Sequence, residues 1–435
     1  MTAALGIGLD IGTSGCRAVA INSLEQRLGM AEVGLPKPTR GAEGRVEQDP
    51  ELWWDATLKV LRQLAATLDR KILQSARHCA LCVDATSATL LLCAPDGTTL
   101  GPALMYNDRS SRAAADQIDR VAPAASAARG AGSSLAKLLH LSAHNQPAST
   151  TLALHQADWV LGRLRGYFGD SDWNNALKLG FDPGARAWPS WLERLLPSSV
   201  SLPRVHPPGT PLGLIDPEVA RLTGLTNNLM LCAGTTDSTA AVIATAADRC
   251  GDAVTSLGST LVLKLIAERP VTAPRYGVYS HRIGERWLIG GASNSGGAVL
   301  RQFFDDARID ALSRSIDPST TSRMNYYPLP ALGERFPVAD PNMAPRLSPR
   351  PKDDAQFLHE LFEGIARIER DGYARLVELG AAAPDRVLTT GGGARNAVWT
   401  GIRRRILGVT VVAAERQDAA DGAALLALRG LRAFS

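Results

Sequence analysis

Lysine is scarce in this chain: it occurs seven times in 435 residues, so most of the 47 basic residues are arginine. The arginines are scattered, no dense run of basic residues is present, and the formal net charge is only +4. Proteins that bind nucleic acid or anionic membranes usually carry a basic cluster. We therefore expect neither of these partners.

Apolar runs long enough to span a bilayer are also missing. The first residues show no basic segment followed by an apolar one, so we expect no signal peptide. Six cysteines are present, and Cys79 and Cys82 form a CxxC motif, but no second pair or histidine cluster completes a zinc site. We expect buried thiols and a reducing, cytoplasmic location.

Four well-known catalytic motifs are absent as well. The chain has no GxxxxGK[ST] loop, no GxGxxG turn after a strand, no HExxH helix and no GxSxG elbow. These absences exclude P-loop, dinucleotide-binding, zincin and α/β-hydrolase sites. The apolar fraction of 45% and the charged fraction of 21% are ordinary for a globular protein, and the length favours two domains.

The most informative stretch lies near the start, at residues 6–21, and reads GIGLDIGTSGCRAVAI. Two apolar runs flank the turn Gly12-Thr13-Ser14-Gly15, which predicts a β-hairpin. Backbone N–H groups and two hydroxyls at such a tip could cradle phosphate. Asp10, just before the turn, is placed to hold hydrated Mg²⁺. The stretch alone is equally consistent with an ordinary hairpin.

Apolar runs that end in acidic, hydroxyl or glycine residues recur along the chain. A strand at 80–84 ends in Asp84 and continues into 90–93, which predicts a second hairpin-like element. A strand at 229–234 ends in Asp237, which is either a helix N-cap or a reactive carboxylate. A glycine-hydroxyl hairpin is expected around 255–260, and a strand at 386–390 leads into a glycine-rich turn.

Other polar segments predict loops. We expect residues 34–48 to form a surface loop and residues 290–297, reading GGASNSGG, to form a loop before a helix. The polar and aromatic clusters at 105–109 and 172–175 are typical of surface loops too.

Together these segments resemble a known family. GLDIGTSGCRAV at 8–19, CAGTTDS at 232–238, TSLGST at 255–260 and TTGGGARNAVW at 389–399 are similar to motifs of the FGGY carbohydrate kinases. The resemblance covers essentially the whole chain. It implies an α/β, two-domain actin-like ATPase (ribonuclease H-like) fold with a nucleotide cleft between the lobes. The expected domains are 1–244, completed by 417–435, and 245–416.

Within that family the chain is similar to the short cyanobacterial and plant-type D-ribulose kinases. The matching segments include DATSATLLLC at 84–93, SSLAKL at 133–138 and YYPLP at 326–330. His140 stands where an aromatic residue is usual, and Ala85 and Ala88 stand where glycines are expected. The lost glycines crowd the loop beside the expected sugar pocket, so they bear on substrate preference rather than on the reaction.

The resemblance implies transfer of the γ-phosphoryl group of ATP, with Mg²⁺, to a primary hydroxyl of a ketopentose, most similar to D-ribulose. The sugar is expected to meet Asp10, Ser87 and Asp237, with Asp237 as general base and Asp10 as metal ligand. ATP is expected at Gly12, Thr13, Ser14, Gly258, Ser259, Gly391, Gly392, Asn396 and Trp399. Arg17 is as consistent with a surface role as with phosphate binding, and Trp399 with a core role. Asn107, Asp108 and Lys137 are further sugar-contact candidates.

Three alternatives remain open from the sequence. D-xylulose or another sugar or polyol is the first. The second is a non-catalytic nucleotide switch on the same fold, which the GTTD sequence ending at Asp237 argues against. The third is a DNA-binding regulator, which would need a helix-turn-helix before the first hairpin. The sequence is consistent with a monomer or a homodimer.

Overall fold

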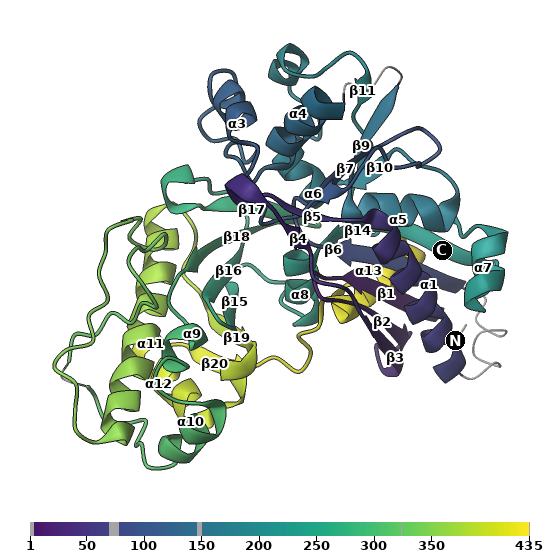
Figure 1. Cartoon of the computed structure of the whole chain (residues 1–435). Coiled ribbons are helices and arrows are strands. Elements are labelled where there is room, and N and C mark those ends of the chain that lie inside the picture. Colours follow the sequence, from purple (N-terminus) through teal and green to yellow (C-terminus); the bar gives the residue numbers. More distant parts are fainter. Residues whose placement is uncertain (1–3, 69–77, 146–149, 323, 435) are drawn as a thin grey trace. The chain divides into compact units, whose positions relative to one another are not determined.

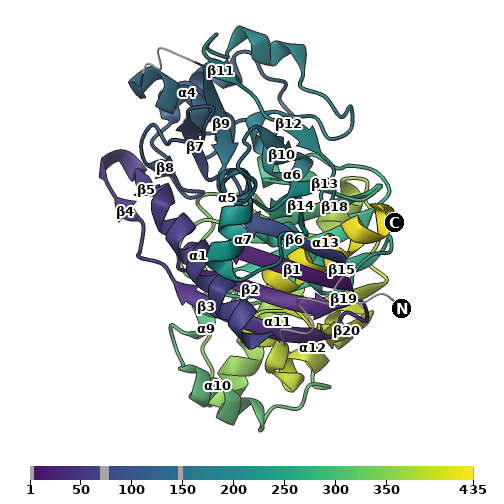
Figure 2. The ribbon, with the colours of Figure 1, turned by 90° about the vertical axis from the view of Figure 1, so that its right-hand side faces the viewer.

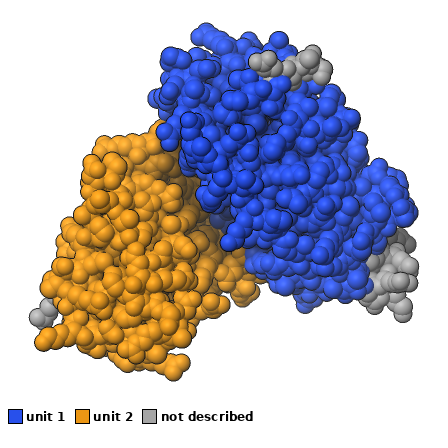
Figure 3. Space-filling view, viewed as in Figure 1, with its two compact units in different colours: residues 1–244, 418–435 blue, residues 245–417 orange. Residues whose placement is uncertain are grey.

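The computed structural model describes residues 4–68, 78–145, 150–322 and 324–434. The outermost residues of the expected domains, 1–3 and 435, lie outside these ranges. The chain divides into two compact units, which Figure 3 colours separately. Unit 1 comprises Met1–Ala244 with Asp418–Ser435, and unit 2 comprises Thr245–Gln417.

Unit 1 is built on a six-stranded sheet with the strand order β13-β14-β6-β1-β2-β3 (Figures 1 and 2). Its strands are β1 Ala4–Ile11, β2 Gly15–Asn22, β3 Arg27–Gly34, β6 His78–Ala85, β13 Pro211–Leu214 and β14 Leu229–Thr236. The β1–β2 pair is antiparallel and confirms the first hairpin. Strands β6 and β14 run parallel to β1, so the carboxyl ends of these three strands meet at one edge of the sheet.

Successive residues of β1 point alternately to the two faces of this sheet. Leu5, Ile7 and Leu9 are fully buried in the core that also holds residues of α1 (Pro50–Thr67) and α5 (Gln156–Arg165). Gly6 and Gly8 face the last helix, α13 (Ala419–Phe434): a Cβ on Gly8 would lie 1.8 Å from the Ala420 carbonyl oxygen. These glycines therefore serve close helix packing rather than the turn.

The remaining elements of unit 1 form a second layer of strands and several helices. A second six-stranded sheet has the order β11-β9-β7-β8-β5-β4, and β10 pairs with β12. The strands are β4 Thr39–Arg40, β5 Val46–Gln48, β7 Leu90–Cys93, β8 Ala103–Leu104, β9 Thr151–His155, β10 Asp170–Asp172, β11 Val200–Ser201 and β12 Arg204–His206. The helices are α3 Arg112–Asp119, α4 Ser134–Asn145, α6 Trp173–Ala176, α7 Pro217–Thr223 and α8 Asp237–Ala244, with short 3₁₀ turns η1 Ala42–Gly44, η2 Leu177–Leu179 and η3 Ser190–Arg194.

Unit 2 has its own six-stranded sheet, ordered β17-β18-β16-β15-β19-β20. The strands are β15 Asp252–Leu257, β16 Leu261–Ala267, β17 Tyr279–Ile283, β18 Arg286–Ser293, β19 Arg386–Thr390 and β20 Thr410–Ala413. The helices are α9 Gly297–Leu300, α10 Asp306–Ser313, α11 Asp354–Glu378 and α12 Ala397–Leu407, with 3₁₀ turns η4 Pro274–Tyr276 and η5 Gly392–Arg395. The β15–β16 hairpin is the second one expected from the sequence.

Three local expectations were wrong. Strands β6 and β7 belong to different sheets, so the segment after Asp84 is a crossing between layers and not a hairpin. Residues 290–293 form the end of β18, because β16 supplies hydrogen-bond partners along this glycine-rich run and β17 pairs with Gly290 on the other side. Part of the segment 34–48 also pairs as β4 and β5.

The polar cluster at 172–175 is not a surface loop either, whereas the segment 105–109 is a turn in which Tyr106 and Arg109 are exposed. Asp108 is fully buried, and the four residues at 172–175 are all buried. Asp172 caps α6 by accepting hydrogen bonds from the backbone of Asn174 and Asn175, so local satisfaction of polar groups permits the burial.

The buried thiols expected from the sequence are present in the structure. The six cysteines are free, and all but Cys250 are buried. Within the described ranges, the model contains no helix with the length and apolar character needed to cross a bilayer.

Candidate active site

Three carboxylates gather at the edge of the unit 1 sheet where β1, β6 and β14 end. Asp10 pairs in register with Asp84 on the neighbouring strand, and Thr235, two residues before Asp237, pairs with Asp84 from the other side. Asp84 is fully buried, whereas Asp10 and Asp237 are partly exposed. Parallel strands thus bring together residues that lie more than 70 positions apart in sequence.

The three carboxylates shift one another's proton affinity. Burial raises the pKa of Asp10 from 3.8 to about 7, the charge of Asp237 adds to the rise, and the neighbouring Asp84 side chain and the charge of Arg17 oppose it. Burial, then the charges of Asp10 and Asp237, raise the pKa of Asp84 well above its ordinary value. Burial and the two neighbouring carboxylates therefore favour the protonated form of Asp84, whose side-chain oxygens are buried and have no hydrogen-bond partner among the described residues.

Asp237 lies between a buried strand and a helix. It is the first residue of α8, and its Oδ1 accepts a hydrogen bond of 2.6 Å from the backbone of Ser238. The positive end of the helix dipole favours the ionised form of a carboxylate at this position. Its place in the first turn does not separate the helix-capping role from the reactive role, because a partly exposed carboxylate can serve both.

The tip of the first hairpin is open at its hydroxyls. The Gly12 N–H donates to the Gly15 carbonyl (2.9 Å), while Thr13 and Ser14 are partly or largely exposed. Arg17, two residues after Gly15 on β2, donates to Glu32 and to Asp418 at 3.0 and 2.9 Å. Its guanidinium is thus already engaged by two carboxylates.

The loop after β6 carries Ser87, and the loop after β8 carries Asn107. The side-chain oxygens of both residues are buried and have no hydrogen-bond partner among the described residues. Asp108, in contrast, accepts from the backbone of Val46 and from Ser110, so its carboxylate is occupied by the fold. Lys137 is fully buried and donates to two backbone carbonyls, which removes it from the set of direct sugar contacts.

In unit 2, the tip of the β15–β16 hairpin rests against the start of α9. The Gly258 and Ser259 carbonyls accept hydrogen bonds from Gly297 and Ala298 (2.9 and 3.1 Å). A Cβ on Gly296, whose φ is +142°, would come within 2.8 Å of the Ser259 oxygen. The last glycines of the 290–297 segment therefore permit a close contact between helix start and hairpin tip.

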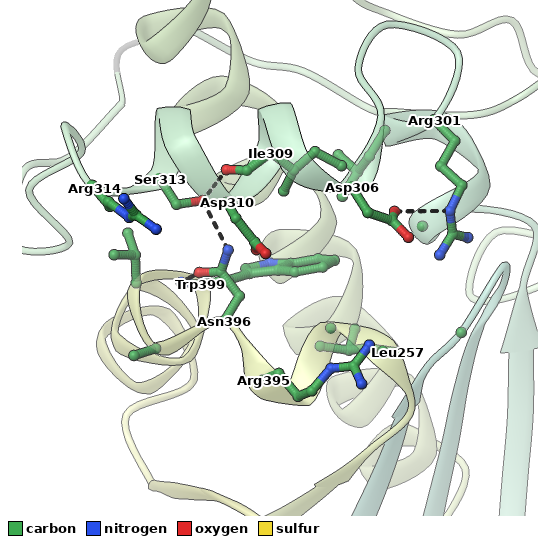
Figure 4. Close-up of a pocket in the computed structure, with 17 residues that line it drawn as sticks. Leu257, Arg301, Asp306, Ile309, Asp310, Ser313, Arg314, Arg395, Asn396 and Trp399 are labelled. Atoms are coloured by element: carbon green, nitrogen blue, oxygen red, sulfur yellow. Dashed lines mark hydrogen bonds and ion pairs between the residues drawn. The ribbon is translucent and has the colours of Figure 1, made fainter.

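A hollow of about 430 Å³ opens beside this tip within unit 2. Figure 4 shows side chains of α10 on one side of it and those of η5 and α12 on the other. The volume falls in the range of small-molecule sites. Its wall includes four of the residues predicted to bind ATP, namely Gly258, Gly392, Asn396 and Trp399.

The glycines at the end of β19 shape this hollow. Gly391 adopts φ +82°, and a Cβ there would lie 2.7 Å from the Leu257 carbonyl oxygen. A Cβ on Gly392 would meet nothing within 4 Å, so its backbone faces open space. The glycine-rich turn thus packs on one side and exposes backbone on the other.

Asn396 and Trp399 combine structural and lining roles. The Asn396 side chain caps α12 by accepting from the Trp399 backbone (2.9 Å), and its amide donates to Ser313 of α10 (2.8 Å). Trp399 stacks on Phe362 with centroids 4.6 Å apart and is 3% exposed, so its ring belongs mainly to the core. It contributes an edge to the hollow.

Several lining residues had no signal in the sequence. Asp310, Ser313 and Arg314 line the hollow from α10 and the residue after it, more than 80 positions before Asn396. Their spacing fits an ordinary surface helix, and only tertiary packing brings them here. Asp84 was visible in the sequence as a strand-end acid, but nothing there indicated that it is fully buried and pairs in register with Asp10.

Comparison with known proteins shows the family of the chain. Residues 5–244 match the N-terminal domain of the "FGGY family of carbohydrate kinases", and residues 253–431 match the C-terminal domain of the same family. The chain belongs to the FGGY family of carbohydrate kinases.

Among its relatives is the xylulose kinase of Escherichia coli (strain K12), 24% identical over 417 residues, which cover 90% of this chain and 83% of that protein. The solved structure of a xylulose kinase from Rhodospirillum rubrum has a TM-score of 0.84 at 25% identity and covers 98% of this chain and 90% of its own. A structure from Brucella ovis described as a "xyloylose kinase" has a TM-score of 0.87 at 24% identity, with 99% and 91% covered. The two-domain α/β architecture is accordingly the actin-like ATPase fold.

Proposed function

We propose that this protein transfers the γ-phosphoryl group of ATP to a ketopentose, D-ribulose in the first place, to give D-ribulose 5-phosphate. The observation that carries the proposal is the convergence of Asp10, Asp84 and Asp237 at one sheet edge of a chain that belongs to a carbohydrate kinase family. Phosphoryl transfer needs positioned charge and a proton acceptor more than covalent chemistry. In this proposal, residues of unit 1 bind the sugar and residues of unit 2 bind adenosine.

Asp237 is the proposed general base. Its position at the start of α8 favours the ionised form that can accept the proton of the attacking hydroxyl. Asp10 is the neighbouring group proposed to meet the sugar, and Asp84 lies beside it on the adjacent strand. Asp237 is thereby the member of the cluster that both reaches the surface and benefits from a helix N-terminus.

The nucleotide is proposed to use the two hairpin tips and the hollow. In unit 1, Thr13 and Ser14 are proposed to offer N–H groups and hydroxyls to phosphate, and Gly12, whose N–H donates to the Gly15 carbonyl, is proposed to let phosphate approach the backbone. In unit 2, Gly258 and Ser259 are proposed to offer backbone N–H groups and the Ser259 hydroxyl. Gly391, Gly392, Asn396 and the edge of Trp399 are proposed to line the adenosine site. The open space over Gly392 and the 430 Å³ volume support this assignment.

The residues also suit a magnesium ion. Among the described residues no group of three His, Cys, Asp or Glu side chains is arranged to enclose a metal. Mg²⁺ ordinarily takes one or two carboxylates and completes its shell with water and substrate phosphates, which Asp10 alone can accommodate. When bound, the ion would neutralise charge on the phosphates. Burial raises the pKa of Asp10 to about 7 although the charge of Arg17 opposes the rise, so a bound cation would further favour the ionised carboxylate.

Ser87 is the proposed sugar contact in the loop after β6. Its buried hydroxyl has no partner among the described residues, and a polar group left in this state is costly unless a ligand completes it. Asn107 has the same property in the neighbouring loop. Both side chains are therefore available to sugar hydroxyls.

D-Xylulose is the second candidate, because relatives such as the Escherichia coli protein are named xylulose kinases. The two pentuloses are epimers and differ in the orientation of one hydroxyl. A panel of ketoses and polyols with Mg-ATP, ranked by kcat/KM in a coupled ADP assay, separates them. The highest value with D-ribulose is expected; the highest value with D-xylulose would select the second candidate, and the highest with glycerol would reject both.

A further inference from the structure

Lys137, in the first turn of α4, is a buried cation that the proposed reaction does not use. Its side chain is 0% exposed, and its Nζ donates to the carbonyl oxygens of Ala88 (2.7 Å) and Met105 (2.8 Å). Burying an ammonium group costs free energy that an apolar residue would not cost. Burial also lowers the pKa of Lys137 to about 7; Asp108 opposes that shift, and Lys178 and Arg109 add to it. The lysine is therefore retained for its two hydrogen bonds.

Those two bonds join the loops that carry Ser87 and Asn107. Ala88 follows Ser87 directly, and Met105 lies two residues before Asn107. The Tyr106 backbone also donates to Thr89 Oγ1 at 3.0 Å, so the two loops contact each other. One ammonium group thus fixes the backbone beside each unpartnered side-chain oxygen.

The conformation at Ala88 explains why such a tie is needed. Ala88 adopts φ +68°, a region that residues with a side chain rarely occupy and that persists only when the surroundings enforce it. A glycine would adopt it without strain, and a glycine is what the resemblance predicts here. The hydrogen bond from Lys137 to the Ala88 carbonyl holds the peptide in this strained turn.

A network of polar groups completes the loop from the other side. The hydroxyls of Thr86 and Thr89 are 2.6 Å apart, and Thr86 donates to Gln156 Oε1 at 2.7 Å. The two hydroxyls and the Gln156 Oε1 are thus partnered within the fold. Ser87 and Asn107 are the neighbours whose buried oxygens are not satisfied within the described residues.

We propose that Lys137 is a positioning residue for the acceptor substrate: it anchors the Ala88 and Met105 carbonyls and so aims Ser87 and Asn107 at the hydroxyls of a small polyhydroxylated ligand. The inference rests on the proposed function, because the ligand it serves is the sugar. Lys137 itself does not touch the substrate, since both of its acceptors belong to the backbone.

The first test compares Lys137→Met with Leu138→Ala. Methionine matches the length of the lysine but cannot donate, whereas Leu138 is a fully buried core residue of the same helix and makes no hydrogen bond to either loop through its side chain. Lys137→Met should raise the KM for the sugar about tenfold or more while the KM for Mg-ATP stays unchanged. Leu138→Ala should lower the melting temperature and leave the sugar KM as it is. An unchanged sugar KM in Lys137→Met, or an equal rise in both variants, would overturn the proposal.

The second test does not depend on turnover. Amide hydrogen exchange in peptides that cover residues 85–90 and 104–109 should be faster in Lys137→Met than in wild type, and should stay at the wild-type rate in Leu138→Ala. Equal protection in Lys137→Met and wild type would overturn the anchoring role. If the wild type phosphorylates no sugar while the exchange result holds, the proposed function fails and the anchoring role stands.

Discussion

The two units repeat one strand plan but place different chemistry at the strand ends. In each central sheet an antiparallel hairpin is followed by parallel strands: β2-β1-β6-β14 in unit 1 and β16-β15-β19-β20 in unit 2. Unit 1 carries Asp10, Asp84 and Asp237 at or directly after the ends of its parallel strands. The corresponding strands of unit 2 end at Leu257, Thr390 and Ala413, and the hollow in this unit is lined by glycines together with apolar and charged side chains.

Buried charge is handled differently as well. In unit 2 Glu369 and Arg403 are both fully buried and form a direct ion pair, with Nε and Oε2 2.6 Å apart. Thr255 and Thr389, near the ends of β15 and β19, each hydrogen-bond to this pair. In unit 1 no arginine or lysine forms an ion pair with Asp10 or Asp84 among the described residues. Paired charge secures a structure, and unpaired charge marks a reactive site.

The largest expected effect is the loss of the acidic group at the end of β14. Asp237→Ala should lower kcat/KM for the sugar by about 10²–10⁴-fold, the usual contribution of a general base. The coupled ADP assay measures it, and calorimetry with Mg-ATP should show nucleotide affinity close to wild type because the hollow proposed for adenosine lies in unit 2. Near-wild-type sugar phosphorylation would remove Asp237 from the role of base.

The next effect concerns the paired charge of unit 2. Arg403→Met leaves Glu369 buried without its cation and should lower the stability of unit 2 by about 3–5 kcal/mol. The urea dependence of amide exchange in β15 and β19 reports this value. The double variant Glu369→Gln with Arg403→Met should recover much of the loss, because no uncompensated carboxylate remains. Equal destabilisation in the single and double variants would contradict this account.

The smallest effect is a pH dependence in unit 1. Between pH 4 and 7 the unfolded chain loses the Asp10 proton while the folded protein keeps it, because folding raises the pKa of Asp10 from 3.8 to about 7. The folded state then binds more protons, so stability falls as pH rises through this window. Asp10→Asn removes the group, so in EDTA its melting temperature should exceed that of wild type by more at pH 8 than at pH 5. A constant difference between the two pH values would count against a raised pKa.

The sequence predicted the parts of the site that are local. Glycine and hydroxyl residues between apolar runs predicted both hairpins, and Asp237 and Gly391 followed runs long enough to be read as buried strands. These signals work because turn chemistry and strand pattern depend on neighbouring residues. The family resemblance supplied their roles.

The rest depends on contacts between distant segments. Nothing near Asp172 indicated that its cluster is buried, because burial there depends on β14, where Asn174 donates to Thr235 at 3.0 Å. The α10 wall of the hollow and the separation of β7 from the sheet of β6 likewise follow from packing across long stretches of chain. The burial of Lys137 could not be predicted for the same reason, since its acceptors lie 49 and 32 residues away.

The position of α13 has a consequence for the order of synthesis. This helix covers β1 through Gly6 and Gly8, and Asp421 in its first turn pairs with Arg27 across 394 residues. During synthesis, this face of β1 stays uncovered until nearly the whole chain has left the ribosome. Unit 2 is a continuous segment and can fold as soon as residues 245–417 have emerged. A nascent chain stopped before residue 418 should bind chaperones through its first hairpin.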